Sequence, residues 1–527
     1  MKRSFADILQ GLDSDRAQKV ARKLPEWAAV GAEIPTALAL EQCSSSATAI
    51  YKAGQAAAAA NLRFAHPSHA SRRGPLPFTK PRVATGLPAA PPDPAEPCLE
   101  VLSEAKTPSG VAAECQRDFR KEVEATESPD EVGHAPFIGG SAQRWGFEES
   151  ERPVRSILDL TGGLGVDSWT FSQVAERVVY FERSGELAEA ARRNFERLGA
   201  ANIEVRCETV TPETELPEAD LIYADPARRD AAGRKVFLLE DCTPDILTLL
   251  PMLLRKAPTV LLKLSPMADL AMLTDRLGPA LREIHVVELD GEVKELLCLL
   301  HPNSDPSEPE IVIVRLSGQA ASAADLRFAY PSHASRRGPL PFTEPARREM
   351  SPWKGVQGVG EQASLLATGL PAAPPAPEGS LRFQLSEERG AEVQYAAEVR
   401  PGDVLLEPCA ALLKAGAFRL PCARWGLLKL APSTHLYLLP GAETPPSAPG
   451  KEFFKPWRVK EVLPFGAAAF RQLKQRYTRA EVTARNLPLG SAELQKKIGI
   501  APGGDVHVFA CRLADASSIL LVTSPAE

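Results

Sequence analysis

The sequence lacks several patterns that would assign it to a familiar class. Its nine cysteines form no Cys-x-x-Cys pair, and their wide spacing argues against a zinc site or a disulfide framework. The most apolar stretch, residues 246–264, contains three basic residues and two prolines, so we expect no membrane span. The first residues contain no apolar segment typical of a signal peptide. We therefore predict a soluble, cytoplasmic protein with free thiols and no metal.

An overall positive charge is also missing. The formal net charge is −6, so no general basic field attracts nucleic acid, and any such interaction must depend on a local patch. The composition, with 44% hydrophobic and 24% charged residues, is ordinary for a globular protein. A length of 527 residues predicts about two to four domains.

Two segments occur twice in the chain. Residues 62–79 and 326–343 are identical except for His66 and Tyr330, and ATGLPAAPP occurs at 84–92 and again at 367–375. Structural repeats recur at periods of about 20–50 residues, so these distant, nearly identical copies indicate a copied genetic element. They have no helix or strand period. We predict that 54–150 and 318–380 are largely disordered insertions. A basic RNA-binding arm formed by HPSHASRR is the alternative.

The segment between the insertions alternates between strand and helix patterns. Short runs rich in Val, Ile and Leu at 156–160, 177–182, 202–206, 219–225 and 259–264 are typical of strands buried on both faces of a parallel sheet. Residues 185–198 place apolar side chains on one helical face. This predicts a doubly wound, Rossmann-like α/β sheet with its ligand at the carboxyl ends of the strands. Residues 284–289 and 295–300 are expected to form an antiparallel edge pair.

A glycine-rich loop, DLTGGLGVD at 159–167, follows the first predicted strand and opens a helix. Its glycines let backbone N–H groups approach a polar ligand at a helix N-terminus. The spacing resembles the acidic-x-Gly-x-Gly-x-Gly loop of enzymes that use S-adenosylmethionine (SAM), with Thr161 replacing the first glycine. In that resemblance Asp159 meets the methionine end of SAM, and Gly163 and Gly165 allow its close passage. A plain tight turn is the alternative.

Two further strands end in candidate site residues. Glu182 is placed to accept hydrogen bonds from ribose hydroxyls, as in NAD enzymes, so it indicates a nucleoside without naming it. YADPARRD at 223–230 resembles the (Asp/Asn)-Pro-Pro-aromatic motif of amino-methyltransferases, in which a side-chain oxygen and the next carbonyl hold an amine. Asp225 and Pro226 match this motif, while Arg228 replaces the aromatic residue; a guanidinium plane can also stack on a base. A surface turn is the alternative.

Lys263 lies within an otherwise apolar strand, where a lysine is costly unless it pairs or reaches solvent. Asp225, Lys263 and Glu292 resemble three members of the Lys-Asp-Lys-Glu tetrad of ribose 2′-O-methyltransferases. The missing lysine should precede the glycine loop, where the candidates are Arg152, Arg155 and Lys52. In that interpretation a neutral Lys263, its pKa lowered by partial burial, accepts the proton of the hydroxyl.

The motifs together resemble a family of bacterial class I SAM-dependent methyltransferases, of the Bacteroidetes type, with a ferredoxin-like segment and a C-terminal THUMP-like domain. The resemblance covers residues 23–53, where Ser44, Ser45 and Thr48 suit a helix cap facing the cofactor. It resumes at 159, includes 405–437 as the ferredoxin-like segment, and ends with 485–510. It implies SAM as the cofactor and RNA as the substrate.

The C-terminal region combines many cations with interleaved aromatic residues, a combination that single-stranded RNA binding uses. The aromatic residues are Phe453, Phe454, Trp457 and Tyr477. The cations are Lys451, Lys455, Arg458, Lys460, Arg471, Lys474, Arg476, Arg479, Arg485, Lys496 and Lys497. A solvated basic face over core aromatic residues is the alternative.

We therefore predict a SAM-dependent methyltransferase that acts on tRNA or rRNA at a base nitrogen. The alternatives are a ribose 2′-O-methyltransferase that uses Asp225, Lys263 and Glu292, and an inactive RNA-binding protein on the same fold. The predicted catalytic residues are Asp225, Pro226, Arg228 and Lys263. The predicted cofactor-binding residues are Asp159, Thr161, Gly162, Gly163, Gly165, Asp167, Glu182 and Glu208. The predicted parts are 1–53 as an N-terminal helical part, 54–150 as an insertion, 151–317 as the core, 318–380 as an insertion, 381–442 as the ferredoxin-like segment and 443–527 as the THUMP-like domain.

The copied segments should be dispensable for folding. A chain lacking 62–92 and 326–375 is expected to unfold cooperatively and to bind SAM, because these segments have no apolar periodicity with which to build a core. Thermal unfolding and calorimetry with SAM check this. Aggregation of the shortened chain would show that the segments are structural.

Overall fold

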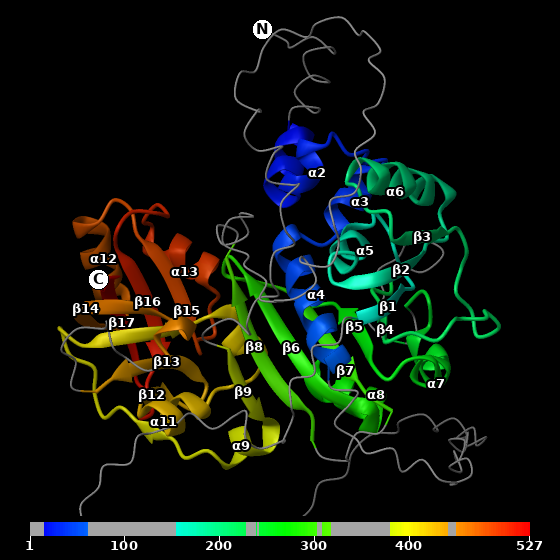
Figure 1. Cartoon of the computed structure of the whole chain (residues 1–527). Helices are drawn as coiled ribbons and strands as arrows, with labels where there is room; N and C mark the ends of the chain where they lie inside the picture. The colour runs from blue at the N-terminus through cyan, green and yellow to red at the C-terminus, as the bar shows by residue number, and fades with distance from the viewer. Residues whose placement is uncertain are drawn as a thin grey trace, which may run out of the picture. The chain divides into compact units, whose positions relative to one another are not determined.

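The computed structural model describes residues 15–61, 154–227, 239, 242–302, 308–317, 380–440 and 450–526 (Figure 1). Within these ranges no helix is long and apolar enough to cross a membrane. Each cysteine in the described part of the chain is free, as expected. Most of both predicted insertions, and Arg152 and Arg228, lie outside these ranges.

The described part of the core is built on a nine-stranded sheet with the order β3-β2-β1-β4-β5-β7-β6-β8-β9. Strands β1, β2, β3, β4 and β5 pair in parallel, which confirms the predicted doubly wound α/β sheet. Their bounds are β1 Val154–Asp159, β2 Ala175–Phe181, β3 Ile203–Arg206, β4 Leu221–Ala224 and β5 Val260–Leu264. The helices along this part are α5 Val166–Phe171, α6 Gly185–Arg197, α7 Ile246–Lys256 and α8 Leu270–Leu277.

The central strands are buried on both faces of the sheet, which explains why their sequences are runs of apolar residues. Every residue of β4 is buried, and β1 and β5 are buried over most of their length. Helix α6 occupies the predicted range, and it begins where the Ser184 side chain accepts the backbone N–H of Leu187. Its Ala191 and Phe195 pack against Tyr180 on the sheet.

The expected antiparallel pair is present, but it does not form the edge of the sheet. Strands β6 (Leu281–Leu289) and β7 (Glu292–Leu300) are antiparallel, and β7 lies between β5 and β6. Beyond β6 the sheet continues with β8 (Glu310–Leu316) and β9 (Leu381–Gln384). Strand β9 was expected in the ferredoxin-like segment, but its hydrogen bonds to β8 make it part of the first sheet.

An N-terminal helix, α4 (Ser46–Asn61), is part of the same unit. It continues past residue 53, so the predicted start of the first insertion at 54 is wrong. Tyr51, Ala53 and Ala56 are buried against the sheet, because small residues let the helix approach it closely. The shorter helices α2 (Pro25–Ala29) and α3 (Ala37–Gln42) precede it, and Trp27 joins the cluster that contains Phe195.

The C-terminal region forms a second sheet, of eight strands within the described residues, in the order β10-β12-β13-β11-β14-β17-β16-β15. Strand β11 pairs with β13 on one side and β14 on the other, so the segments predicted as 381–442 and 443–527 share one sheet. Helices α12 (Ala467–Arg476) and α13 (Ser491–Ile498) cover part of it through Leu473 and Leu494. The strands are β10 Gln394–Tyr395, β11 Val404–Pro408, β12 Leu428–Ala431, β13 Thr434–Leu439, β14 Phe454–Pro464, β15 Glu481–Arg485, β16 His507–Arg512 and β17 Ser518–Pro525.

Candidate active site

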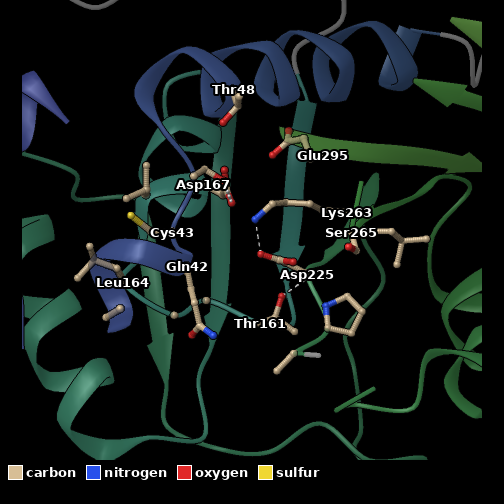
Figure 2. A pocket seen from close by; sticks show the side chains of 18 of the residues that line it. Gln42, Cys43, Thr48, Thr161, Leu164, Asp167, Asp225, Lys263, Ser265 and Glu295 are labelled. Carbon is tan, nitrogen blue, oxygen red and sulfur yellow. Dashed lines mark hydrogen bonds and ion pairs between the residues drawn. The ribbon is translucent and has the colours of Figure 1, made fainter. Parts of the chain in front are cut away.

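A pocket of about 1920 Å³ opens at the carboxyl ends of the parallel strands of the first sheet, where doubly wound folds bind ligands. It is lined by the glycine loop after β1, by Glu182 after β2, by Asp225 after β4 and by Lys263 of β5. Residues 38–48, which include the start of helix α4, form another part of its wall. Figure 2 shows Asp225 and Lys263 side by side, with Thr161 on the opposite side of Asp225.

The three glycines of the loop serve different needs. Gly163 has a φ of +54°, and an added Cβ would meet only the Thr161 carbonyl, at 3.8 Å, so its left-handed backbone is the reason for a glycine here. A Cβ on Gly162 would lie 2.0 Å from the ring of Tyr180, and one on Gly165 would lie 2.6 Å from the ring of Phe195. Gly162 and Gly165 therefore allow close packing within the protein, and Gly165 also lines the pocket, where its predicted role beside the cofactor stays a prediction.

Asp159 is turned into the protein, not toward the pocket. It is 1% exposed, and its two carboxylate oxygens accept the Thr161 backbone N–H at 3.1 Å and the Ser168 hydroxyl at 2.6 Å. It does not line the pocket, although the loop residues on both sides of Thr161 do. This orientation speaks against the predicted contact between Asp159 and the methionine end of SAM. The carboxylate instead holds the glycine loop against the start of α5.

Glu182 lies in the pocket wall and is oriented by the backbone. Its carboxylate oxygens accept N–H groups from Gly163 and Ser184, each at 2.8 Å. Two fixed acceptors beside a glycine loop suit the neighbouring hydroxyls of a ribose. Glu208, also predicted, lines the same pocket and is exposed.

Asp225 and Lys263 form an ion pair at the pocket. The Asp225 side chain is 34% exposed and that of Lys263 is 12% exposed, so both can meet a ligand. The Asp225 backbone N–H donates to the Thr161 hydroxyl at 2.6 Å, and Pro226 follows in the pocket wall. The structure thus brings together the predicted residues Asp225, Pro226 and Lys263.

A second, deeper ion-pair cluster lies beside this pair. The ammonium group of Lys52, on helix α4, is fully buried and lies 2.9 Å from Glu295 and 3.3 Å from Asp167. It also donates to the Ser44 hydroxyl at 3.0 Å. Asp167 accepts hydrogen bonds from Ser44 and from the Tyr223 hydroxyl as well. Of the candidates for the N-terminal basic residue, Lys52 thus lies in a cluster beside Asp225 and Lys263, whereas Arg155 lies near Asp220.

Glu292 is not the acidic member of this arrangement. Its side chain is 73% exposed and pairs with Lys294, while Glu295 is 2% exposed and lines the pocket. The two positions are three residues apart on β7, and successive strand residues point to opposite faces. Sequence spacing alone therefore selected the wrong glutamate.

The charges in the cluster determine the protonation of Lys263. Burial by itself lowers the pKa of Lys263, but Asp225, Glu295 and Asp167 outweigh it, so its pKa is raised above the usual value. The expectation of a lowered pKa for Lys263 is therefore wrong, because it counted burial and left out the effect of the nearby carboxylates. In this state the lysine is an ammonium group at neutral pH.

The polar residues before α4 form the predicted cap. Thr48 donates its backbone N–H to the Ser45 hydroxyl at 3.3 Å, and the two hydroxyls lie 3.2 Å apart. Ser44, Ser45 and Thr48 all line the pocket. The N-terminus of α4 therefore faces the ligand space, as we expected.

The C-terminal aromatic residues do not form a surface for bases. Phe453, Phe454 and Trp457 are 2%, 6% and 5% exposed and belong to hydrophobic clusters, and Tyr477 packs partly against another. Several cations are also engaged within the protein: Arg476 pairs with Glu461 and Arg485 pairs with Glu407. The expectation of interleaved stacking rings is therefore wrong, because the rings fill the core of the sheet.

Two family models match the C-terminal part of the chain, and solved structures are similar to it. Residues 455–525 match a family model described as THUMP domain-like, and residues 405–441 match one described as a ferredoxin-like domain. A candidate methyltransferase from Porphyromonas gingivalis W83 is similar with a TM-score of 0.60 and 25% identity, over 97% of this chain and 89% of that chain. An rRNA methylase from Streptococcus thermophilus has a TM-score of 0.22 and 12% identity, over 28% of this chain and 87% of that chain. No curated protein matches the chain.

The fold and pocket define the class: the first sheet has the Rossmann-like fold of SAM-dependent methyltransferases. The C-terminal part carries a ferredoxin-like domain and a THUMP-like domain, which confirms the resemblance drawn from the sequence.

The buried Asp159 should make stability depend on pH. Burial raises the pKa of Asp159 to about 7, so the folded chain binds a proton that the unfolded chain releases near pH 4. This contribution to stability is present below about pH 4 and is lost as the pH rises through about 7. Asp159→Asn keeps a neutral hydrogen-bonding group, so its melting temperature relative to the wild type should rise by a few degrees from pH 5 to pH 8. An unchanged difference in thermal unfolding would show that Asp159 stays ionised throughout.

Proposed function

We propose that the protein is a SAM-dependent methyltransferase that acts on RNA, either tRNA or rRNA. The observation that carries this proposal is the pocket itself, in which the backbone-held carboxylate of Glu182 and the Asp225–Pro226 segment meet at a glycine loop. When bound, SAM supplies an electrophilic methyl group. Glu182 would hold its ribose, and the loop from Thr161 to Gly165 would lie along it. The THUMP-like domain supports RNA as the substrate class.

We infer that the acceptor is a base nitrogen. One oxygen of Asp225 is engaged by Lys263, which leaves the other oxygen and the Pro226 carbonyl to accept hydrogen bonds from an amine. Two acceptors at the pocket wall would orient the lone pair of the nitrogen toward the methyl group. Positioning of this kind supplies much of the rate when the electrophile is already reactive. In this reaction Lys263 has only a supporting role, through its ion pair with Asp225.

A ribose 2′-hydroxyl is the second candidate acceptor, and one observation favours it. Lys52, Asp225, Lys263 and Glu295 come together from α4, β4, β5 and β7, in the arrangement that resembles the ribose-methyltransferase tetrad. In this mechanism Lys263 must first lose its proton. The positive sulfonium of SAM would favour this loss, because a like charge lowers the pKa of a lysine.

Four exposed cations on two neighbouring helices form the best candidate surface for RNA phosphates. Arg471 and Lys474 lie on α12, and Lys496 and Lys497 lie on α13. The Lys474 side chain lies beside Gly499, at the end of α13, so the two helices present adjoining charges. In the described part of the chain, none of the four is paired with a carboxylate. Unpaired cations can release the counterions of a nucleic acid, which favours binding.

The acceptor can be distinguished with variants of the ion pair. With a base nitrogen, Asp225→Ala should abolish transfer, while Lys263→Met should retain substantial activity, because positioning needs the carboxylate. With a ribose hydroxyl, both changes should be equally damaging, and the wild-type rate should rise with pH toward the raised pKa of Lys263. The assay is methyl transfer to RNA from a strain that lacks the gene, followed by nuclease digestion and mass spectrometry. A methylated ribose would refute the base-nitrogen proposal.

The cations of α12 and α13 should control RNA affinity. Changing Arg471, Lys474, Lys496 and Lys497 to Ala is expected to weaken RNA binding and to reduce the salt slope by about one for each phosphate that the variant no longer neutralises. The matched control changes to Ala four exposed cations in the part of the chain that forms the first sheet and its helices: Lys19, Arg192, Arg255 and Arg276. Affinity measured across a salt series compares the two. Equal weakening in both variants would place the RNA site elsewhere.

A further inference from the structure

Thr161 departs from the glycine pattern of its loop, and the structure gives its side chain a specific contact. Its hydroxyl accepts the backbone N–H of Asp225 at 2.6 Å (Figure 2). The backbone N–H of Thr161 in turn donates to the inward-facing Asp159 at 3.1 Å. A glycine at this position would offer no acceptor to Asp225. The side chain therefore links the loop after β1 to the segment after β4.

This contact is one of several that hold the segment 225–227. Lys263 engages the Asp225 carboxylate. Ala227 exchanges two backbone hydrogen bonds with Thr243, at 2.8 and 3.1 Å. Pro226 lies between these attachments, with a restricted φ and no N–H of its own. The direction of its carbonyl therefore depends on how the residues on either side are held.

We propose that Thr161 is a positioning residue, which aligns the Asp225–Pro226 acceptors with the cofactor held by the same loop. This inference rests on the proposed function. The loop would hold the cofactor mainly through its backbone, which a change of the Thr161 side chain leaves in place. Alignment of the acceptor is more sensitive, because a displacement of about 1 Å can reduce a transfer rate by about 10²-fold. Thr161 thus acts on kcat rather than on cofactor affinity.

Three substitutions in the full chain separate this role from a general one. Thr161→Gly restores the glycine of the pattern, Thr161→Val keeps the shape without the acceptor, and Thr161→Ser keeps the hydroxyl. We expect kcat to fall by about 10- to 100-fold for Gly and Val and to recover largely for Ser. The dissociation constant for SAM should stay within about threefold in all three. Thr274→Val is the matched control, since its hydroxyl bonds to Leu270 outside the pocket, and it should leave kcat unchanged.

Exchange of the Asp225 amide gives a readout that needs no RNA. In the wild type and Thr161→Ser this amide should exchange slowly, and in Thr161→Gly and Thr161→Val it should exchange at least tenfold faster, as measured by hydrogen–deuterium exchange. Wild-type kcat in Thr161→Gly, or equal exchange in all variants, would overturn the inference. If the wild type methylates no RNA, the proposed function fails, while the exchange rates still decide whether Thr161 holds the segment.

Discussion

The structure of the site depends on one buried ammonium group. Lys52 has no exposed surface, and it reaches Glu295 on β7, Asp167 on α5 and Ser44 before its own helix. Loss of one partner of such a cluster leaves a buried charge uncompensated, which typically costs about 3–5 kcal/mol. Helix α4 is therefore attached to the sheet by charge as well as by its alanine-rich face. The wall that α4 contributes to the pocket exists because this attachment holds.

The same cluster affects the protonation of Lys263, which lines the pocket. Asp167 and Glu295 contribute to the raised pKa of Lys263, and Lys263 engages Asp225. Asp225 is in turn bonded through its backbone to Thr161 of the glycine loop. Charge interactions and hydrogen bonds thus run from an N-terminal helix to the loop after β1. Both candidate reactions use the Asp225–Lys263 pair within this series, and they differ in whether the lysine keeps its proton.

The sequence allowed prediction of what depends on local pattern. The strands from β1 to β5 and helix α6 were found because burial on both faces, or on one helical stripe, leaves a periodic signal. Asp225 and Lys263 were found because they depart from that signal at strand ends. Strand β9 was misassigned, because a short strand carries no mark of which sheet it joins.

The remaining errors concern side-chain direction. Glu292 and Glu295 are both plausible acids in one strand, and only the register with β5 and β6 shows which faces the pocket. Asp159 fits the pattern of a ligand-binding acid, yet its oxygens are used by Thr161 and Ser168. An aromatic residue among cations, such as Trp457, gives the same sequence pattern whether its ring faces solvent or the core. The direction of each of these side chains is determined by tertiary packing, which the sequence pattern does not show.

The net charge of the ion-paired residues at and beside the pocket favours a cationic ligand. The two ammonium groups of Lys52 and Lys263 lie among the carboxylates of Asp167, Asp225 and Glu295, so one negative charge is left over. Charges act more strongly on one another at such partly buried positions than in bulk water. A positively charged sulfonium bound beside these residues would be attracted by their excess negative charge. A neutral thioether in the same place would gain no such attraction.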